Sequence, residues 1–234
     1  MTGGAHRVGR AIVLELADAR CRVGLHYGTS VDAAKQTASE LEERGVTMSL
    51  HQGDLSIAGV AEQVVAEASE AIGPLRVLVN SAAVFPEDRI ETITREQWDT
   101  TVAINLNAPV FLTQAFAAQL PDGMTGSVVN ISDWRIERPY PDHFSYNVTK
   151  GALSSFTRVA AAALAPRVRV NALALGAILP PPGKDFAYLR ELAQDIPLRR
   201  PGSPEAVGKA VRALLENDFV TGQVLGVTGG AELV

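Results

Sequence analysis

The sequence predicts an α/β protein in which a single doubly wound parallel sheet is covered by helices on both faces. Three observations support this fold class: strand-like and helical segments alternate, the strand-like segments are continuously apolar, and a glycine-rich turn precedes the first helix. A chain of 234 residues with 47% hydrophobic and 20% charged residues can bury one sizeable core. We therefore expect one domain, residues 1–234, without repeats or a linker.

The expected elements follow from the spacing of the apolar residues. Strands are expected at 21–27, 47–52, 75–80, 127–132, 168–173 and 223–227, and helices at 11–16, 31–44, 57–72, 94–120, 146–164 and 204–215. The longest of these helices should bury Trp98, Val102, Leu106 and Phe116.

Two irregular segments remain, at 84–93 and 176–200, and each follows a strand. In open α/β sheets, ligands bind beyond the carboxyl ends of the strands, where both segments should lie. We interpret residues 176–200 as a substrate lid with a short helical piece near 186–194.

Composition argues against several classes of function. The net charge of -5 is spread along the chain without a basic run, so we expect no nucleic-acid and no membrane partner. No apolar run approaches the roughly 20 residues of a membrane helix, and the start has no signal-peptide core. Cys21 is the only cysteine, which rules out an internal disulfide and favours a cytoplasmic protein. No metal is expected, because no metal-ligand spacing links His6, His26, His51 and His143.

Residues 2–10 form a glycine-rich turn that runs into the first expected helix. Glycine lets the backbone approach a ligand closely, and the free N–H groups of a helix N-terminus attract anions. The turn therefore suits a diphosphate, and the alternative is an ordinary flexible turn.

Tyr146 and Lys150 are four residues apart on an expected helix, so their side chains share one face. A nearby ammonium favours the phenolate and lowers the pKa of a tyrosine from its usual value of about 10. The pair could then exchange a proton with a bound substrate. The alternative is a buried tyrosine beside a solvated lysine.

The glycine turn and the Tyr146–Lys150 pair belong to a set of five motifs that follow one another in a fixed order. They are the turn with Gly3 and Gly9, Asp54 after a strand, Asn80-Ser81-Ala82-Ala83 after the next strand, Asn105 in the long helix, and Tyr146 with Lys150. In this order the residues resemble the short-chain dehydrogenase/reductase family over essentially the whole chain. The resemblance implies a Rossmann-type fold and a hydride transfer between nicotinamide and a small-molecule substrate.

The resemblance also implies roles for individual residues. Tyr146 would donate or accept the proton, and Lys150 would hold the nicotinamide ribose and tune Tyr146. Asn105 would anchor a water molecule of the proton relay, and Asp54 would hold the adenine through its side chain.

The start of the chain departs from this family, which has a full strand before the glycine turn in the middle of the sheet. Only Met1 stands there in this chain. We therefore expect the first strand to be missing or truncated, through a start site placed too late or a shortened chain. Such a gap would leave backbone groups of the neighbouring strands unpaired, which is costly when they are buried.

A second departure concerns the position thirteen residues before the tyrosine, where the family has a serine that donates to the substrate carbonyl. This chain has Asp133 there, and Ser132 one residue earlier. Neighbouring residues of a strand point to opposite faces, so only one of the two should face the cofactor. A carboxylate would repel a carbonyl oxygen, but it accepts hydrogen bonds from amino and ring N–H groups. Asp133 therefore indicates a nitrogen heterocycle as the substrate.

Several further positions make the chain look like the pteridine reductases within this family. They are Arg7 in the glycine turn, the run with His26, Tyr27 and Ser30, and Phe85 after the asparagine motif. Phe85 would stack on one face of a pterin, or it plugs the loop as an ordinary apolar residue. Arg7 would touch the cofactor phosphates and the pterin edge.

The expected cofactor is NADP(H). Tyr27 occupies the place where NAD-dependent members carry an acidic residue for the ribose hydroxyls, so a 2'-phosphate is tolerated. Thr29 stands where related enzymes have a basic residue, which argues against strict discrimination between NADP and NAD.

The resemblance thus implies three groups of site residues. The catalytic group is Asp133, Tyr146, Lys150 and Asn105, and the substrate-binding group is Phe85, Arg7, Asp133 and Tyr146. The cofactor-binding group is Gly3, Arg7, Val8, Gly9, His26, Tyr27, Ser30, Asp54, Leu55, Asn80, Ser81, Ala82, Tyr146, Lys150 and Gly176.

Three functions stay open at this point. The first is an NADPH-dependent reductase of a pterin, a dihydrofolate-like compound or another C=N heterocycle. The second is a carbonyl or acyl reductase in which Ser132 faces the substrate, and the third is a non-catalytic nucleotide-binding or assembly module. A homo-oligomer, often a tetramer in the resembled family, is also expected.

Overall fold

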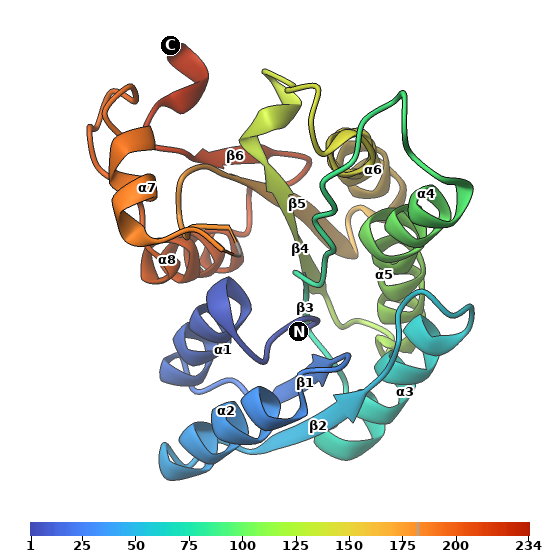
Figure 1. The fold of residues 1–234 in the computed structure, drawn as a ribbon. Helices are drawn as coiled ribbons and strands as arrows, with labels where there is room; N and C mark the ends of the chain where they lie inside the picture. Colours follow the sequence, from blue (N-terminus) through green and yellow to red (C-terminus); the bar gives the residue numbers. More distant parts are fainter. Residues whose placement is uncertain (182) are drawn as a thin grey trace.

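The computed structural model describes residues 1–181 and 183–234. The strands are β1 Val23–Tyr27, β2 Met48–Gln52, β3 Val77–Asn80, β4 Gly126–Asp133, β5 Val168–Leu175 and β6 Val224–Val227. The helices are α1 Arg7–Asp18, α2 Val31–Glu43, α3 Val60–Ile72, α4 Arg95–Val102, α5 Ala108–Gln119, α6 Phe144–Leu164, α7 Phe186–Leu192 and α8 Pro204–Glu216. Three short helical segments are η1 Ala103–Asn107, η2 Trp134–Ile136 and η3 Ala231–Leu233. Strands and helices alternate as predicted (Figure 1).

All strand pairs are parallel, but the sheet is divided into two parts, β1–β2 and β3–β4–β5–β6. The first two residues lie between them. His26 N donates to Met1 O at 2.9 Å, and Thr2 N donates to Val79 O at 3.0 Å. The single sheet expected from the sequence is therefore interrupted at the place of the expected missing strand, because two residues bridge the parts without forming a strand.

Helices cover both faces of the sheet (Figure 1). Val79 and Val129 join the apolar cluster under α1 and α8, whereas Leu78 and Val128 join the cluster under α3, α5 and α6. Successive residues of a strand point to opposite faces, so both faces of β3 and β4 are buried. This burial explains why the strand segments are continuously apolar.

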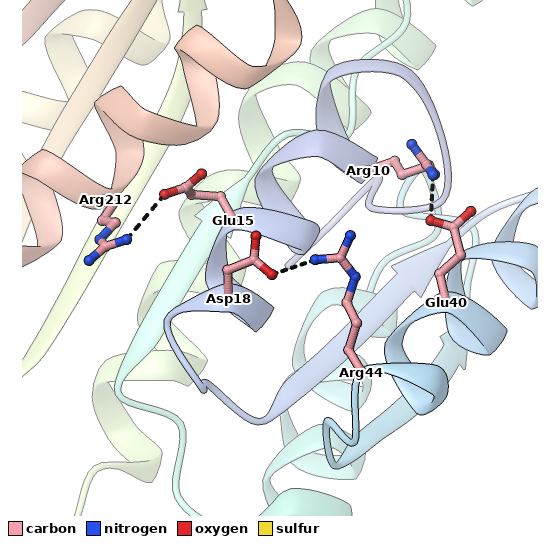
Figure 2. Close-up of polar contacts among 6 residues, drawn as sticks. All are labelled: Arg10, Glu15, Asp18, Glu40, Arg44 and Arg212. Atoms are coloured by element: carbon pink, nitrogen blue, oxygen red, sulfur yellow. Dashed lines mark hydrogen bonds and ion pairs between the residues drawn. The ribbon is translucent and has the colours of Figure 1, made fainter.

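Helix α1 fixes the position of the glycine turn that precedes it. Its residues Ile12 and Leu16 pack into the cluster shared with α8. Figure 2 shows the ion pairs around α1, which join Arg10 to Glu40, Asp18 to Arg44 and Glu15 to Arg212. These side chains are partly exposed, so apolar packing contributes more to the position of α1 than the ion pairs do.

The long helix expected at 94–120 is a continuous helix of 25 residues, Arg95–Gln119, with a π-helical turn at η1. Phe116 is fully buried, as predicted, but Trp98, Val102 and Leu106 are only half-buried. A π-helical turn adds a residue, so the helix before it is rotated relative to the helix after it. The buried face expected for a regular α-helix therefore does not continue from one side of η1 to the other.

By length and composition this helix could cross a membrane, since the mean hydropathy of its best window is 1.2. The core helices of globular proteins pass the same test, and here Leu112 and Phe116 pack into a core cluster. The sequence expectation overlooked this segment because uncharged polar residues interrupt its apolar ones.

The expected lid, residues 176–200, follows the carboxyl end of β5 and contains α7. Leu189, Ala193 and Ile196 are buried, and the last two form a small apolar cluster with Ala231. Pro182, which the expected lid includes, lies outside the described residues. The second half of the segment is therefore packed against the C-terminal end of the chain.

Replacing Gly9 by alanine should destabilise the protein by roughly 1–3 kcal/mol, as other overpacked sites do. A β-carbon at Gly9 would lie 1.9 Å from Gly3 O, so the turn must shift. The control is Gly151→Ala in α6, where a β-carbon meets no atom within 4 Å and alanine favours the helix. Urea unfolding measures both, and equal stabilities of the two variants would contradict the close approach.

Candidate functional site

A cavity of about 670 Å³ lies at the carboxyl ends of the strands, between the glycine turn and the start of α6. Predicted residues that line it are Gly3, Arg7, Val8, Gly9, His26, Ser30, Asp54, Leu55, Ser81, Ala82, Phe85, Ser132, Asp133, Tyr146 and Lys150. Tyr27, Asn80, Asn105 and Gly176 are not among the lining residues. The structure thus gathers most of the predicted site around one hollow.

Sequence reasoning missed other lining residues. They are His6, Gly28, Gln52, Gly53, Val84, Ile104, Ile131 and Leu175. Four of them, Gly28, Gln52, Gly53 and Leu175, lie at the end of a strand or directly follow one, and this position is the signal that could have found them.

Three of the four predicted residues outside the lining have other contacts. Tyr27 packs against an apolar cluster that includes residues of α1 and α2. Asn80 Nδ2 donates to Asn130 Oδ1 at 2.8 Å in the interior. Gly176 permits a close chain crossing, since a β-carbon there would lie 2.7 Å from Thr228 Cα.

The glycine turn brings its backbone close to the end of β3. Gly3 has a φ of +61°, and a β-carbon on it would lie 2.9 Å from Ala82 Cα. Thr2 Oγ1 accepts hydrogen bonds from the amides of Ser81 and Ala82, at 3.1 and 3.2 Å. The turn precedes α1, so its amides and the helix dipole favour an anion at this end of the cavity.

Arg7 begins α1 and has a left-handed φ of 54°. Its guanidinium donates to Pro180 O at 2.8 Å and so joins the glycine turn to the expected lid. The bond uses only part of its hydrogen-bonding capacity, so other donors are available to an anionic ligand.

At the end of β1, His26 is 3% exposed and its Nε2 lies 3.0 Å from Gly53 O. A carbonyl can only accept, so Nε2 carries the proton and Nδ1 of the neutral ring is an acceptor. Nδ1 is buried and has no partner in the part of the chain that the structure describes. Burial lowers the pKa of His26 to about 4, so the ring is neutral at pH 7.

Asp54 lies at the same end of the cavity, after β2. Its Oδ1 accepts from Ser56 Oγ at 2.7 Å and from Ser56 N at 2.9 Å, which lowers the pKa of the carboxyl group. The carboxylate is therefore charged at neutral pH and can accept a hydrogen bond from a ligand.

At the other end, Tyr146 Oη donates to Asp133 Oδ2 at 3.0 Å. The second oxygen, Oδ1, accepts from Arg135 N at 2.9 Å, which orients the carboxyl group. Lys150 Nζ donates to Ile131 O at 2.7 Å and lies 5.5 Å from the centre of the Tyr146 ring. The phenol, the ammonium and the carboxyl group therefore meet at one end of the cavity.

Ser132 also lines the cavity, but its hydroxyl has other partners than Tyr146. Its hydroxyl lies 3.0 Å from Ser154 Oγ and 3.3 Å from Lys150 O, and the residue is 2% exposed. Because β4 continues through Asp133, adjacent residues alternate between faces and the aspartate takes the side of Tyr146.

The protonation of Tyr146 differs from what the sequence led us to expect for the Tyr146–Lys150 pair. Burial raises the pKa of Tyr146 well above its ordinary value, and the charge and hydrogen bond of Asp133 raise it further. The expected lowering of this pKa by Lys150 is therefore wrong for this structure, because burial and the carboxylate dominate. Burial lowers the pKa of Lys150 to about 8, against an opposing effect of Asp133. At neutral pH Tyr146 holds its proton and can act as a donor.

Asn105 has a structural role that its spacing did not reveal. Its Oδ1 accepts from Val84 N and its Nδ2 donates to Val84 O, both at 2.9 Å. Nδ2 also lies 3.4 Å from Thr149 Oγ1. The amide in η1 therefore fixes the backbone directly before Phe85.

Phe85 is 38% exposed and lies over the start of α6. Its ring stacks on His143 with centroids 3.7 Å apart and meets the Tyr146 ring in a T-shaped contact at 4.6 Å. His143 thus covers one face of Phe85, the Arg135 guanidinium lies over the ring at 5.8 Å, and the ring lines the cavity next to Tyr146.

Asp88 anchors the start of α6, and sequence reasoning missed it. Its Oδ1 accepts from Ser145 N at 3.0 Å, and its Oδ2 accepts from the Ser145 hydroxyl. Beside it, Pro86 O lies 2.6 Å from His143 Nδ1, and Phe144 N donates to Asp88 O at 3.2 Å. The loop that carries Phe85 and the helix that carries Tyr146 are therefore joined by several bonds. A cap supplied by a remote loop leaves no periodic signal in the sequence.

Within residues 1–181 and 183–234, no group of three or more histidine, cysteine, aspartate or glutamate side chains could hold a metal ion. The side chains that line the cavity supply hydrogen bonds, a proton donor in Tyr146 and positive charge from Lys150 and Arg7.

The similarity to known proteins extends over nearly the whole chain. The family described as enoyl-(acyl carrier protein) reductase matches residues 3–232. A putative ketoacyl reductase 2 of the granaticin polyketide synthase, from Streptomyces violaceoruber, is 33% identical over 241 residues, covering 100% of this chain and 95% of the relative.

Among solved structures, FolM alternative dihydrofolate reductase 1 from Brucella canis, complexed with NADP, is 38% identical with a TM-score of 0.93. The similarity covers 100% of this chain and 93% of that one. A blue fluorescent protein from a metagenomic library, in complex with NADPH, is 30% identical with a TM-score of 0.90, over 98% of this chain and 95% of that one.

Replacing Asp88 by alanine should lower the free energy of unfolding by roughly 2–3 kcal/mol, because α6 loses its cap and the buried Ser145 hydroxyl loses a charged acceptor. Equilibrium unfolding in urea measures the change. Glu87→Ala is the matched control, since it removes an exposed carboxylate one residue away. Equal stabilities of the two variants would show that the anchor contributes nothing.

Stability should fall as the pH drops through the range in which His26 resists protonation. The unfolded chain binds a proton at His26 below about pH 6.5, but the folded chain does so only near pH 4. The folded state therefore loses about 3 kcal/mol between those values. His26→Gln should flatten this acid limb in unfolding curves at several pH values, whereas His6→Gln, at an exposed histidine, should retain it.

Proposed function

The chain belongs to the short-chain dehydrogenase/reductase family, and on that premise we propose that it is an NADP(H)-dependent reductase of a pterin- or dihydrofolate-like C=N heterocycle. The observation that carries the proposal is the hydrogen bond between Tyr146 and Asp133. It brings a protonated phenol and a carboxylate to one point of the cavity.

The described residues fit the cofactor. β-Carbons at Gly3 and Gly9 would collide with Ala82 and with Gly3 O, so these glycines allow the tight turn that places amides and a helix N-terminus at the cavity, where a diphosphate is favoured. The unpaired Nδ1 of His26 is an acceptor that a ribose hydroxyl or the adenine amino group could satisfy. Gly28, Thr29 and Ser30, which line the cavity after β1, include no carboxylate to repel a 2'-phosphate. The FolM structure contains NADP, which supports the same cofactor.

The substrate end of the cavity favours a nitrogen heterocycle. The Asp133 carboxylate accepts hydrogen bonds from amino and ring N–H groups, and it would repel the oxyanion that forms when a ketone is reduced. Tyr146 supplies a proton to a ring nitrogen as NADPH, when bound, supplies the hydride to the adjacent carbon. Phe85 lines the cavity beside Tyr146, where an aromatic side chain can contact a flat substrate ring.

Reduction of a carbonyl or acyl substrate is the second candidate, and the similarity to a ketoacyl reductase favours it. In this case the oxyanion needs hydroxyl donors. The Ser132 hydroxyl is engaged with Ser154 and the Lys150 carbonyl, so Tyr146 would have to act without it.

We also propose that the protein forms a homotetramer and is cytoplasmic. Exposed apolar side chains on the outer surfaces of α5 and α6, Phe111 and Val159, support association of copies of the chain.

Turnover of a dihydropterin separates these functions. The wild-type protein should oxidise NADPH when the dihydropterin is added, and Tyr146→Phe should lower kcat by about 100-fold or more, because the proton donor is lost. Asp133→Asn should lower the rate far more than Ser132→Ala, since only the aspartate contacts Tyr146.

The control is NADPH binding measured by its fluorescence, which the three variants should keep. Unchanged turnover in Tyr146→Phe would rule out the proposed proton donor. A larger loss in Ser132→Ala, with ketones as better substrates, would favour the carbonyl reductase. Binding of NADPH without turnover of any pterin, aldehyde or ketone would favour a non-catalytic module.

A further inference from the structure

A serine, a histidine and a glutamate lie together where β2 meets α3, outside the cavity. Ser49 and His51 are two residues apart in β2, so their side chains point to the same face of the strand. Ser49 Oγ lies 2.7 Å from His51 Nε2, and the other ring nitrogen, Nδ1, lies 3.5 Å from Glu67 Oε2 in α3. This order, with the hydroxyl at Nε2 and the carboxylate at Nδ1, is the one that activates the nucleophile of serine proteases.

The carboxylate decides the direction of the bond between the hydroxyl and the ring. Gln63 Nε2 donates to Glu67 Oε1 at 2.7 Å, and this bond together with the neighbouring imidazole lowers the pKa of the Glu67 carboxyl group. A carboxylate can only accept, so it favours the proton on Nδ1 of His51. Nε2 of the neutral ring is then an acceptor, and the Ser49 hydroxyl donates to it. His51 is therefore placed as a general base for this hydroxyl.

The burial of the three side chains suits such a pair. Ser49 is half-buried and the Glu67 side chain is 44% exposed, whereas His51 is 6% exposed. In the described part of the chain β2 pairs with β1 alone, so Ser49 stands on an edge strand. The base is thus shielded from water while the serine stays partly accessible. A reagent for Ser49 must be small, because the residue is not part of the cavity.

We propose that Ser49 is a nucleophile that takes up the acyl group of a small activated ester, with His51 as its base. Ser49 Oγ attacks the carbonyl carbon, and the hydroxyl proton passes to His51 Nε2. The bond from this carbon to the leaving oxygen then breaks, and the proton goes to the departing alcohol. An ester and a serine thereby become an alcohol and an O-acyl serine. Glu67 is a positioning residue, which holds the imidazole in the required tautomer. This acylation is independent of the proposed reductase reaction.

The competing explanation is that the three side chains only brace β2 against α3. A brace gives Ser49 no reactivity, whereas a base does so only while its ring is neutral. The titratable groups that face His51 are Glu67 from α3 and His26, its partner in the register with β1. Because His26 is neutral at pH 7, Glu67 is the charge that acts on the ring. The two roles therefore differ in reactivity and in its dependence on pH.

The test is acetylation by p-nitrophenyl acetate, with excess NADP present so that cofactor covers the cavity. In the wild-type protein the acetyl group should be found on Ser49, within the tryptic peptide 45–76. His51→Gln should slow this acetylation at least tenfold, because the general base is lost. Ser39→Ala, at an exposed serine of α2, is the control and should leave the rate at Ser49 unchanged.

Two further measurements distinguish a base from a brace. The rate at Ser49 should rise as the pH increases through the range in which histidine loses its proton, about pH 6.5, and His51→Gln should lose this rise. Glu67→Ala should slow acetylation and increase the share of the Nε2–H tautomer of His51, measured by nitrogen NMR shifts. Equal rates at Ser49 in the wild-type protein and His51→Gln would overturn the proposal. Acetyl groups found only on other residues of the wild-type protein would also overturn it, and this result requires no variant to fold.

Discussion

The hydrogen bond between Tyr146 and Asp133 is the interaction on which the arrangement of the site depends. It forms because β4 continues through Asp133, which turns this residue toward Tyr146 and the Ser132 hydroxyl away from it. It also requires a fixed start of α6, which the Asp88 carboxylate provides by accepting from the amide and the hydroxyl of Ser145. A strand end and a helix cap, rather than a flexible loop, therefore set the separation of the two groups.

The same bond decides the protonation of the site. Tyr146 is buried beside a carboxylate, so its proton stays on the phenol at neutral pH. Lys150 is also buried, and Asp133 partly compensates the loss of hydration of its ammonium. Lys150 Nζ gives one hydrogen bond to Ile131 O and keeps other donors for a ligand. In this structure Lys150 acts through its charge and its donors, whereas the carboxylate controls the phenol.

The fold and the location of the site could be predicted from the sequence, because alternating patterns define a parallel sheet and ligands bind at its carboxyl edge. The face on which Asp133 lies was reduced to two choices by the alternation of strand residues. Other features depend on tertiary contacts that spacing does not encode. The π-helical turn that directs Asn105 to Val84, the remote cap of Asp88 and the stacking of His143 on Phe85 are of this kind. The direction in which the Tyr146 pKa shifts was predicted wrongly, because a four-residue spacing does not show that the side chain is buried.

The cavity extends over both parts of the interrupted sheet. The end of the cavity with His26 and Asp54 belongs to the β1–β2 part, and the end with Asp133 belongs to the β3–β6 part. Between the strands of the two parts, Thr2 contributes bonds to Val79, Ser81 and Ala82, while Met1 bonds to His26. A dinucleotide that lies along the cavity contacts residues of both parts. A ligand that binds only the folded state adds its binding free energy to stability, so a bound cofactor strengthens the connection between the two parts of the sheet.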